Sequence, residues 1–322
     1  MDRRFVVAAG CLLVPLSLAL SPLVPRRTGV LPGEFLVPPN VTSAAPSCGQ
    51  CHSINPNANG VMKLSITAPR SLIAGASVPV AVRVSGGPNV GVGGFVMDTD
   101  AGAFVPDPET RTTASGDAIT HANGFFDFWQ FQFQAPAAPG LVRWLAAGQA
   151  VNGIGSLGDS WGFYGPDSSV GGVPFQLFVN DPSVRPFGSG CAGADEHEPI
   201  LGARAPMTVG QPFSVELHNV APGSRAFCFA GTSNTNFGPL ALPVELGSVG
   251  APGCWLLTNH VLVHDESATG VGSGGGSATF DWPVPPDPQL IGGRVFFQAI
   301  VVDPAANALG LTSTAALEAT VQ

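Results

Sequence analysis

Apolar and polar residues alternate along much of the chain with the period of two that is typical of half-buried β-strands. The alternation is clearest at residues 63–68, 78–84, 93–97, 125–134 and 141–147. Pro- and Gly-rich turns separate these segments. In the aromatic segment, the period predicts two opposite faces, one with Phe125, Asp127, Trp129, Phe131 and Phe133, the other with Phe126, Phe128, Gln130 and Gln132.

The same alternation returns after a break near residues 180–186, where Asp181-Pro182 and Arg185-Pro186 interrupt strand pairing. Short strands are then predicted at residues 213–218, 226–230, 255–262, 278–282, 295–302 and 316–321. No helical periodicity lies between the strands, which excludes parallel βαβ units. The pattern predicts an all-β protein of two antiparallel β-sandwiches, at residues 61–180 and 187–322.

The amino-acid composition and net charge argue against a helical fold and against two classes of binding partner. The 322 residues include 42 Gly and 31 Pro, which argues against long helices. Charged residues make up 11%, and the formal net charge is −9. Because nucleic acid and anionic lipid are bound through basic patches, we expect neither as a partner.

The first residues have the organisation of a secretory signal peptide. Arg3 and Arg4 precede an apolar run from Phe5 to Leu20, and the small residue Ser21 follows. The run is shorter than the ~20 residues of a membrane-spanning helix. We therefore expect residues 1–29 to be a signal peptide, with an uncleaved membrane anchor as the alternative. The mature chain would then be exported without a transmembrane span, to the periplasm, the cell surface or the extracellular space.

Residues 48–52 read Cys-Gly-Gln-Cys-His, the C-x-x-C-H spacing of covalent c-type haem attachment. Two thiols three positions apart add to the two vinyl groups of one haem, and the next histidine reaches the iron. We expect residues 30–60 to form a haem-attachment segment, with thioethers from Cys48 and Cys51 and with His52 as the proximal axial ligand of haem c. The alternative is a redox pair or a plain disulfide between the two cysteines.

A six-coordinate iron needs a second axial ligand, and we expect His121 to supply it from the face opposite His52. It is the only histidine of the first predicted sandwich, and it opens the loop before the aromatic segment. Its alternative role is to form a hydrogen bond that orients the turn. Met97 and Met62 rank next as ligands, although both are more typical of core packing. The aromatic residues that would shield a haem edge from water are Phe125, Phe126 and Trp129.

The first half contains, in this order, APSCGQCHS, GGFVMDTDAGAF, Ile119-Thr120-His121, FDFWQFQFQAP and GLVRWLAAGQAVNGIGSLGD. With these pieces, residues 44–164 resemble the reelin-domain-like module of bacterial secreted proteins, the "choice-of-anchor" type with a cysteine motif ahead of it. The resemblance implies an immunoglobulin-like sandwich with the C-x-x-C-H segment at its N-terminal edge. The family pattern also has a histidine at the position of His121. The resemblance implies no activity.

The second half contains FGSGCAG, APGCWLL, FDWPVPPDPQLIGGRVFFQAIVVDP and ANALGLTSTAALEATVQ. These segments resemble a C-terminal β-sandwich module that recurs in secreted proteins of environmental bacteria. The resemblance implies a disulfide between Cys191 and Cys254, which would contribute ~4 kcal/mol in the chain-entropy model. Cys228 lies in the middle of RAFCFAG and is predicted to be a buried apolar side chain.

Other polar clusters of the second half predict no site. Residues 195–198 read Asp-Glu-His-Glu, but consecutive residues of an extended segment point in alternate directions and cannot converge on one metal ion. His260 and His264 would at best share a strand face, too far apart to chelate a metal. Residues 267–277 are expected to be a flexible connection. No G-x-S-x-G nucleophile signature with matching partners is present.

Two hypotheses for the function follow. The first is an exported monohaem c-type protein that transfers electrons or senses a redox partner or small ligand. The second is a non-enzymatic cell-surface protein that adheres to a surface component or binds carbohydrate, in which Cys48–Cys51 is only a disulfide. A hydrolase ranks third. The absorption spectrum of protein made with the haem-attachment machinery distinguishes the first two.

Overall fold

The computed structural model describes residues 61–87, 92–151 and 159–322. Strands dominate these ranges, and the helical elements within them are the 3₁₀ turns η2 (Gly247–Val249) and η3 (Pro288–Leu290). No helix in this part of the chain has the length and apolar character that a transmembrane span requires. The predicted signal peptide and haem-attachment segment lie outside the described residues.

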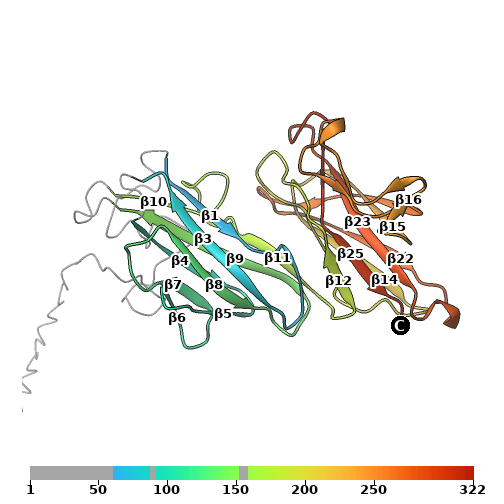
Figure 1. Cartoon of the computed structure of the whole chain (residues 1–322), viewed down its shortest axis with the longest axis horizontal. Coiled ribbons are helices and arrows are strands. Elements are labelled where there is room, and N and C mark those ends of the chain that lie inside the picture. The colour runs from blue at the N-terminus through green and yellow to red at the C-terminus, as the bar shows by residue number, and fades with distance from the viewer. Residues whose placement is uncertain (1–60, 88–91, 152–158) are drawn as a thin grey trace, which may run out of the picture.

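The first sandwich consists of two facing sheets (Figure 1). The smaller sheet has the order β1 (Lys63–Thr67), β3 (Ser77–Ser85), β8 (Phe128–Gln134), β5 (Ala103–Val105). The larger has the order β2 (Ser71–Ile73), β11 (Phe175–Asn180), β9 (Gly140–Ala150), β4 (Gly93–Thr99), β7 (Ala118–His121), β6 (Thr110–Thr112), and β10 (Ser160–Phe163) pairs with β9. Among these strands, β2 and β11 form the one parallel pair.

The aromatic residues of β8 show where the first core lies. Trp129, Phe131 and Phe133 are at most 3% exposed, whereas Phe128 is 39% exposed on the outer face. From the opposite sheet, Trp144 packs against Phe133 with ring centroids 4.8 Å apart. The predicted alternation is therefore confirmed within β8. A shift of one residue would turn all three inner rings toward water.

The second sandwich also has two sheets. One has the order β12 (Val184–Phe187), β25 (Ala316–Thr320), β23 (Arg294–Val302), β15 (Arg225–Gly231), β20 (Leu262–Ser267), and β24 (Leu311–Ser313) pairs with β23. The other has the order β13 (Ile200–Gly202), β14 (Pro212–Val220), β22 (Gly276–Pro283), β21 (Thr269–Gly270). Two further strand pairs are β16 (Asn236–Phe237) with β17 (Leu240–Ala241), and β18 (Val244–Glu245) with β19 (Trp255–Leu256). The predicted all-β fold of antiparallel sandwiches is confirmed.

The link between the sandwiches is shorter than predicted. The first sandwich ends with β11 at Asn180, and β12 of the second already begins at Val184. Residues 184–187 pair with β25, so Arg185-Pro186 does not interrupt pairing. Pro186 is tolerated because β12 is an edge strand, where one side of the backbone has no neighbour to bond.

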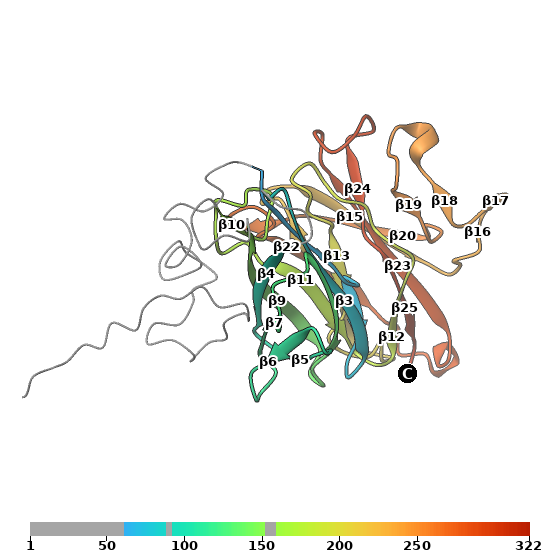
Figure 2. The ribbon, with the colours of Figure 1, turned by 60° about the vertical axis from the view of Figure 1, so that its left-hand side comes forward.

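The two sandwiches lie side by side and contact each other through β11 and β13 (Figure 2). Phe178 of β11 is fully buried and stacks on His218 of β14, with ring centroids 5.7 Å apart. Gln176 of β11 is also buried, and its Nε2 donates a hydrogen bond to Gly274 O at 2.9 Å. Apolar packing and a buried polar contact therefore join the two sandwiches.

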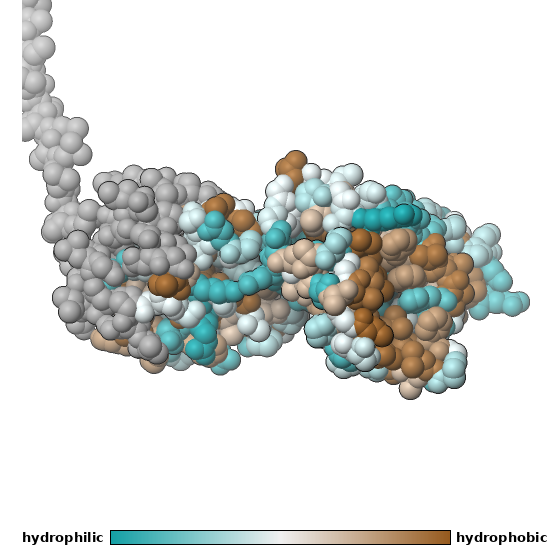
Figure 3. Space-filling view, turned by 90° about the horizontal axis from the view of Figure 1, so that it is seen from above, coloured by the Kyte–Doolittle hydropathy of each residue, from teal (hydrophilic) through white to brown (hydrophobic). Residues whose placement is uncertain are grey.

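Apolar surface gathers on the C-terminal sandwich (Figure 3). Strand β20 lies at the edge of its sheet, and its Leu262 and Val263 are 60% and 54% exposed. Adjacent strand residues point to opposite faces, so both faces of the sheet are exposed at these two residues. An edge strand of this kind presents unpaired backbone groups to solvent.

Candidate functional site

The structure places three of the predicted iron ligands, His121, Met97 and Met62. Cys48, Cys51 and His52 lie outside the described residues, so the haem-attachment motif remains a prediction from the sequence. Within the described residues, no group of three or more His, Cys, Asp or Glu side chains could hold a metal ion.

His121 is the last residue of β7 and is only 5% exposed. Its Nδ1 accepts a hydrogen bond from the Phe95 N–H at 3.0 Å and lies 3.1 Å from Phe95 O. Thr120 Oγ1 donates to the same carbonyl oxygen at 2.5 Å. His121 thus ends a strand rather than opening a loop. One nitrogen of its ring is fixed on the neighbouring strand β4.

The imidazole of His121 lies against Gly94 of β4. A Cβ atom at residue 94 would come within 2.8 Å of Nε2 and 3.0 Å of Nδ1, so a larger residue would displace the ring. The ring centroids of Trp129 and Phe95 lie 5.9 Å and 6.3 Å from that of His121. The sequence thus has a glycine where the imidazole packs against the backbone of β4, and it has aromatic residues on the other sides of the ring.

Burial lowers the pKa of His121 to about 4; the Phe95 backbone opposes this shift, and the charge of Arg111 adds to it. The imidazole is therefore neutral at pH 7, and one nitrogen keeps a lone pair. The two contacts at Nδ1 correspond to the two neutral tautomers. When Nδ1–H donates to Phe95 O, the lone pair is on Nε2, which is the arrangement found in metal-binding histidines.

His121 lies at the end of the first sandwich where the described chain begins. A Cβ atom at Gly87 would be 3.3 Å from Ala150 Cα, and Ala150 pairs with Gly93, next to the glycine that supports His121. Val61 contacts the adjacent residue Gly86. Val61 and His121 therefore lie toward the same end of the first sandwich.

The three aromatic residues that were predicted to shield a haem edge do not lie together on one surface. Trp129 is 1% exposed and belongs to the core. Phe125 and Phe126 precede β8 and are 61% and 40% exposed, so the predicted alternation does not extend to them. A Cβ atom at Gly93 would be 3.6 Å from the Phe126 carbonyl oxygen, which places this aromatic pair near the same end of the sandwich.

Met97 and Met62 are core residues, the role that is typical of methionine. Met97 is fully buried and Met62 is 2% exposed, both within the core of the first sandwich. A Cβ atom at Gly148 would be 3.0 Å from Met62 Cε, so the side chain fills space left by that glycine. Of the three described candidates, His121 is the one with a nitrogen lone pair.

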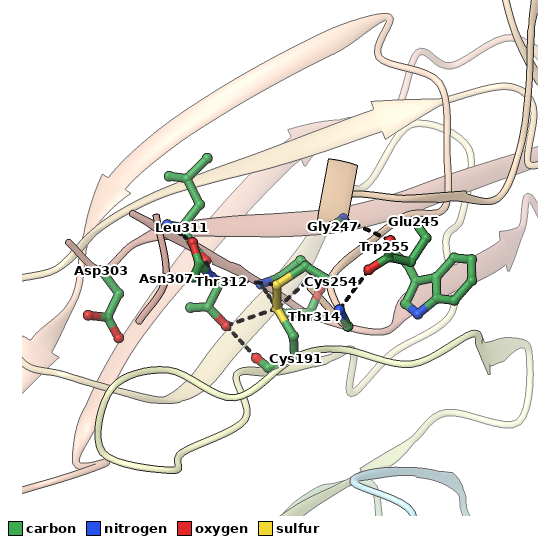
Figure 4. Close-up of a disulfide and its surroundings, with 12 residues drawn as sticks. Cys191, Glu245, Gly247, Cys254, Trp255, Asp303, Asn307, Leu311, Thr312 and Thr314 are labelled. Carbon is green, nitrogen blue, oxygen red and sulfur yellow. Dashed lines mark hydrogen bonds between the residues drawn. A yellow bond between two sulfur atoms is a disulfide. The ribbon is translucent and has the colours of Figure 1, made fainter. Parts of the chain in front are cut away.

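Cys191 and Cys254 form the predicted disulfide (Figure 4). Their Cα atoms are 4.9 Å apart, and the bond joins the segment after β12 to the loop before β19. The Cys191 N–H donates to Ser313 O at 2.9 Å, and Thr312 Oγ1 donates to Cys191 O. Cys228 is fully buried in β15, and burial raises the pKa of its thiol. The predicted core role of Cys228 is confirmed.

The polar residues of the second half meet in a way the sequence did not predict. His260 stacks on Phe229 at 3.8 Å, and His264 stacks on Trp282 at 4.4 Å, so each histidine has its own aromatic partner. His197 Nε2 lies 2.7 Å from the hydroxyl of Ser273, 76 residues further along the chain. The only hint of this contact in the sequence is the glycine run around Ser273, where a backbone can come close to other groups.

Comparison with known proteins adds little to this description. No known protein family and no curated protein matches the chain. One solved structure that matches is the cohesin module of a family 33 glycoside hydrolase from Clostridium perfringens ATCC13124, with 11% identity and a TM-score of 0.24. The match covers 38% of this chain and 98% of that module. The likeness to reelin-domain-like modules remains a prediction.

Proposed function

We propose that the protein is an exported monohaem c-type protein that transfers electrons or senses a redox partner or small ligand outside the cytoplasm. Cys48 and Cys51 would hold the haem covalently, and His52 would be its proximal ligand. The bound haem would supply one-electron chemistry or a ligand-binding iron. The observation that carries the proposal is the C-x-x-C-H sequence of residues 48–52, and the buried His121, fixed through Nδ1, supports a second axial ligand.

Two features of His121 support its proposed role as an iron ligand. His121 needs no proton removed at pH 7 to bind iron, because burial lowers its pKa to about 4. Its ring is held by Phe95 and Gly94, so ligand binding would order no further side chain. Eight residues lie between His52 and Val61, and the nine Cα-to-Cα steps span at most ~30 Å, which brings the motif within reach of this end of the sandwich.

Expression of the full chain with the haem-attachment machinery tests the proposal. We expect a mass increment of one haem and a reduced α-band that survives acid-acetone extraction. Cys51→Ser should weaken or remove the attachment. A colourless wild-type protein with a Cys48–Cys51 disulfide would overturn the haem proposal and favour the surface-binding alternative.

The role of His121 has its own test. His121→Ala should convert a low-spin spectrum to a high-spin one, and His121→Met should restore a low-spin form because a thioether can replace the imidazole. His264→Ala is the matched control, since His264 stacks on Trp282 in the other sandwich. An unchanged low-spin spectrum in His121→Ala would refute ligation by His121 and leave the covalent haem standing.

A further inference from the structure

A serine hydroxyl and a histidine meet where the two sandwiches join. His197 lies in the loop before β13, and Ser273 lies in the turn between β21 and β22. His197 Nε2 is 2.7 Å from Ser273 Oγ, and the Ser273 hydroxyl is also placed to donate to Asp195 Oδ2 at the longer distance of 3.4 Å. Ser273 is exposed to solvent, whereas His197 is partly buried. A histidine at this distance is placed to accept the proton of the hydroxyl.

Asn219 supplies the third group. In β14, residues 218 and 219 oppose the single residue Ser277 of β22, which is a β-bulge. Asn219 sits in this bulge with φ 59°, a conformation that asparagine tolerates better than most residues. It is 2% exposed, and its Oδ1 has no hydrogen-bond partner among the described residues. The bulge thus turns a buried, unpaired acceptor toward the neighbouring loops.

The Asn219 side chain and the His197 ring converge on Gly274. A Cβ atom at residue 274 would be 2.8 Å from Asn219 Oδ1 and 2.9 Å from His197 Nδ1. Gly274 has φ +66° and no side chain, which leaves both groups room to approach each other. A Cβ atom at this position would press on both side chains, and the positive φ also favours glycine.

The orientation of the Asn219 amide decides the tautomer of His197. Asn219 Nδ2 donates to Glu198 O at 2.8 Å, so Oδ1 is the atom left to face the imidazole. A buried acceptor without a donor is costly, so a proton on Nδ1 of the His197 ring, which lies against the same glycine as Asn219 Oδ1, is favoured. With the proton on Nδ1, Nε2 carries the lone pair and is the nearer of two acceptors for the Ser273 hydroxyl proton, Asp195 Oδ2 being the other. That is the tautomer of a general base.

The charge state of His197 is also that of a base. Burial lowers the pKa of His197, with the charge of Arg70 acting in the same direction, whereas Asp195, Asn219 and Glu196 oppose the shift. The imidazole is therefore neutral at pH 7.

We propose that Ser273 is a nucleophile, with His197 as its general base and Asn219 as the positioning residue, and that the substrate is a small carboxylic ester. Ser273 Oγ would bond to the carbonyl carbon while His197 Nε2 takes the hydroxyl proton. The alkoxide then leaves with that proton as an alcohol. Water, activated by the same histidine, releases the acid and restores Ser273.

A cleft that His197 lines, although Ser273 does not, indicates what kind of ester fits next to the histidine. It encloses about 230 Å³ between the sandwiches, and Asp195 and His197 line it from one side. Lys63 and Arg70 line it from the other, with Lys63 Nζ 2.8 Å from Glu196 Oε2. Arg70 donates to Tyr164 Oη at 3.3 Å. These charged and hydroxyl groups favour short, polar acyl or alcohol groups over long alkyl chains.

Labelling of the full chain with a fluorophosphonate, followed by peptide mass spectrometry, tests the proposal. The reagent forms a phosphoester with an activated serine and releases fluoride, so the expected product is one adduct on Ser273. Ser273→Ala and His197→Ala should lower labelling and p-nitrophenyl acetate hydrolysis at least tenfold. Ser277→Ala, on the adjacent strand, is the matched control and should label like the wild type.

Two variants of Asn219 separate positioning from structural support. Asn219→Gly keeps the positive φ and removes Oδ1, so labelling should fall about tenfold while the unfolding transition moves little. Asn219→Asp keeps an acceptor beside His197 Nδ1 and adds a negative charge. Because this charge raises the pKa of His197, the labelling rate should increase at a higher pH than in the wild type. Wild-type labelling no faster than Ser273→Ala, or full labelling in a folded His197→Ala variant, would overturn the proposal.

Discussion

Phe178→Ala tests whether the two sandwiches unfold as one unit. The ring is fully buried at the joint, stacks on His218 at 5.7 Å between centroids, and lies 5.5 Å from the Arg204 guanidinium. Removing a buried phenylalanine side chain costs ~3–5 kcal/mol when it leaves a cavity in a core. At this joint the sandwiches can separate without opening either core, so we expect a loss at the lower end, ~3 kcal/mol.

Urea denaturation of the full chain measures this loss. The wild type should unfold in one transition, and Phe178→Ala in two, because the joint no longer couples the cores. Phe128→Ala is the matched control, since its ring is 39% exposed on an outer face, and it should change the free energy of unfolding by ~0.5 kcal/mol or less. A single Phe178→Ala transition that coincides with the wild type would refute the coupling.

Two further changes test the second sandwich. Burial raises the pKa of Glu216, but hydrogen bonds from His218 and Arg204 outweigh it and lower the pKa from 4.5 to about 2. The stability from this carboxylate is present above pH 4.5 and is lost as the pH falls toward 2. In Glu216→Gln, the free energy of unfolding in urea should therefore change less with pH between 4.5 and 2. An unchanged slope in that window would contradict this. Replacing Cys191 and Cys254 together by serine should lower the free energy of unfolding by up to ~4 kcal/mol, and a loss below ~1 kcal/mol in urea would contradict the loop-entropy argument.

The sequence predicted the fold where side-chain period and burial agree. In β8, the rings of Trp129, Phe131 and Phe133 identify the core face because one face of the sheet is dry and the other is wet. The cysteine pairing followed from resemblance to a secreted module. Both predictions rest on strong local signals, either periodic burial or a repeated motif.

Strand predictions were wrong where side chains, rather than a neighbouring strand, form hydrogen bonds with the backbone. The expected strand at 255–262 is split into β19 and the start of β20, because Asn259 Oδ1 accepts hydrogen bonds from the Thr232 and Ser233 N–H groups at 2.8 and 2.9 Å. Such local bonds compete with strand pairing, and apolar periodicity does not report them. Residues 267–277 were expected to be a flexible connection, yet β21 and β22 pair there as a hairpin.

The Ser273 site lay beyond sequence reasoning for a related reason. Its groups come from three separate segments, and what joins them is the extra residue of the β14 bulge. With regular pairing, residue 219 would take an ordinary strand conformation with negative φ. The bulge instead gives Asn219 its positive φ, and Gly274 leaves the gap in which its amide and the His197 ring converge. Neither the bulge nor the gap has a periodic signature. Asn219 and Gly274 therefore look like ordinary turn residues in the sequence, and only strand register shows that they support His197.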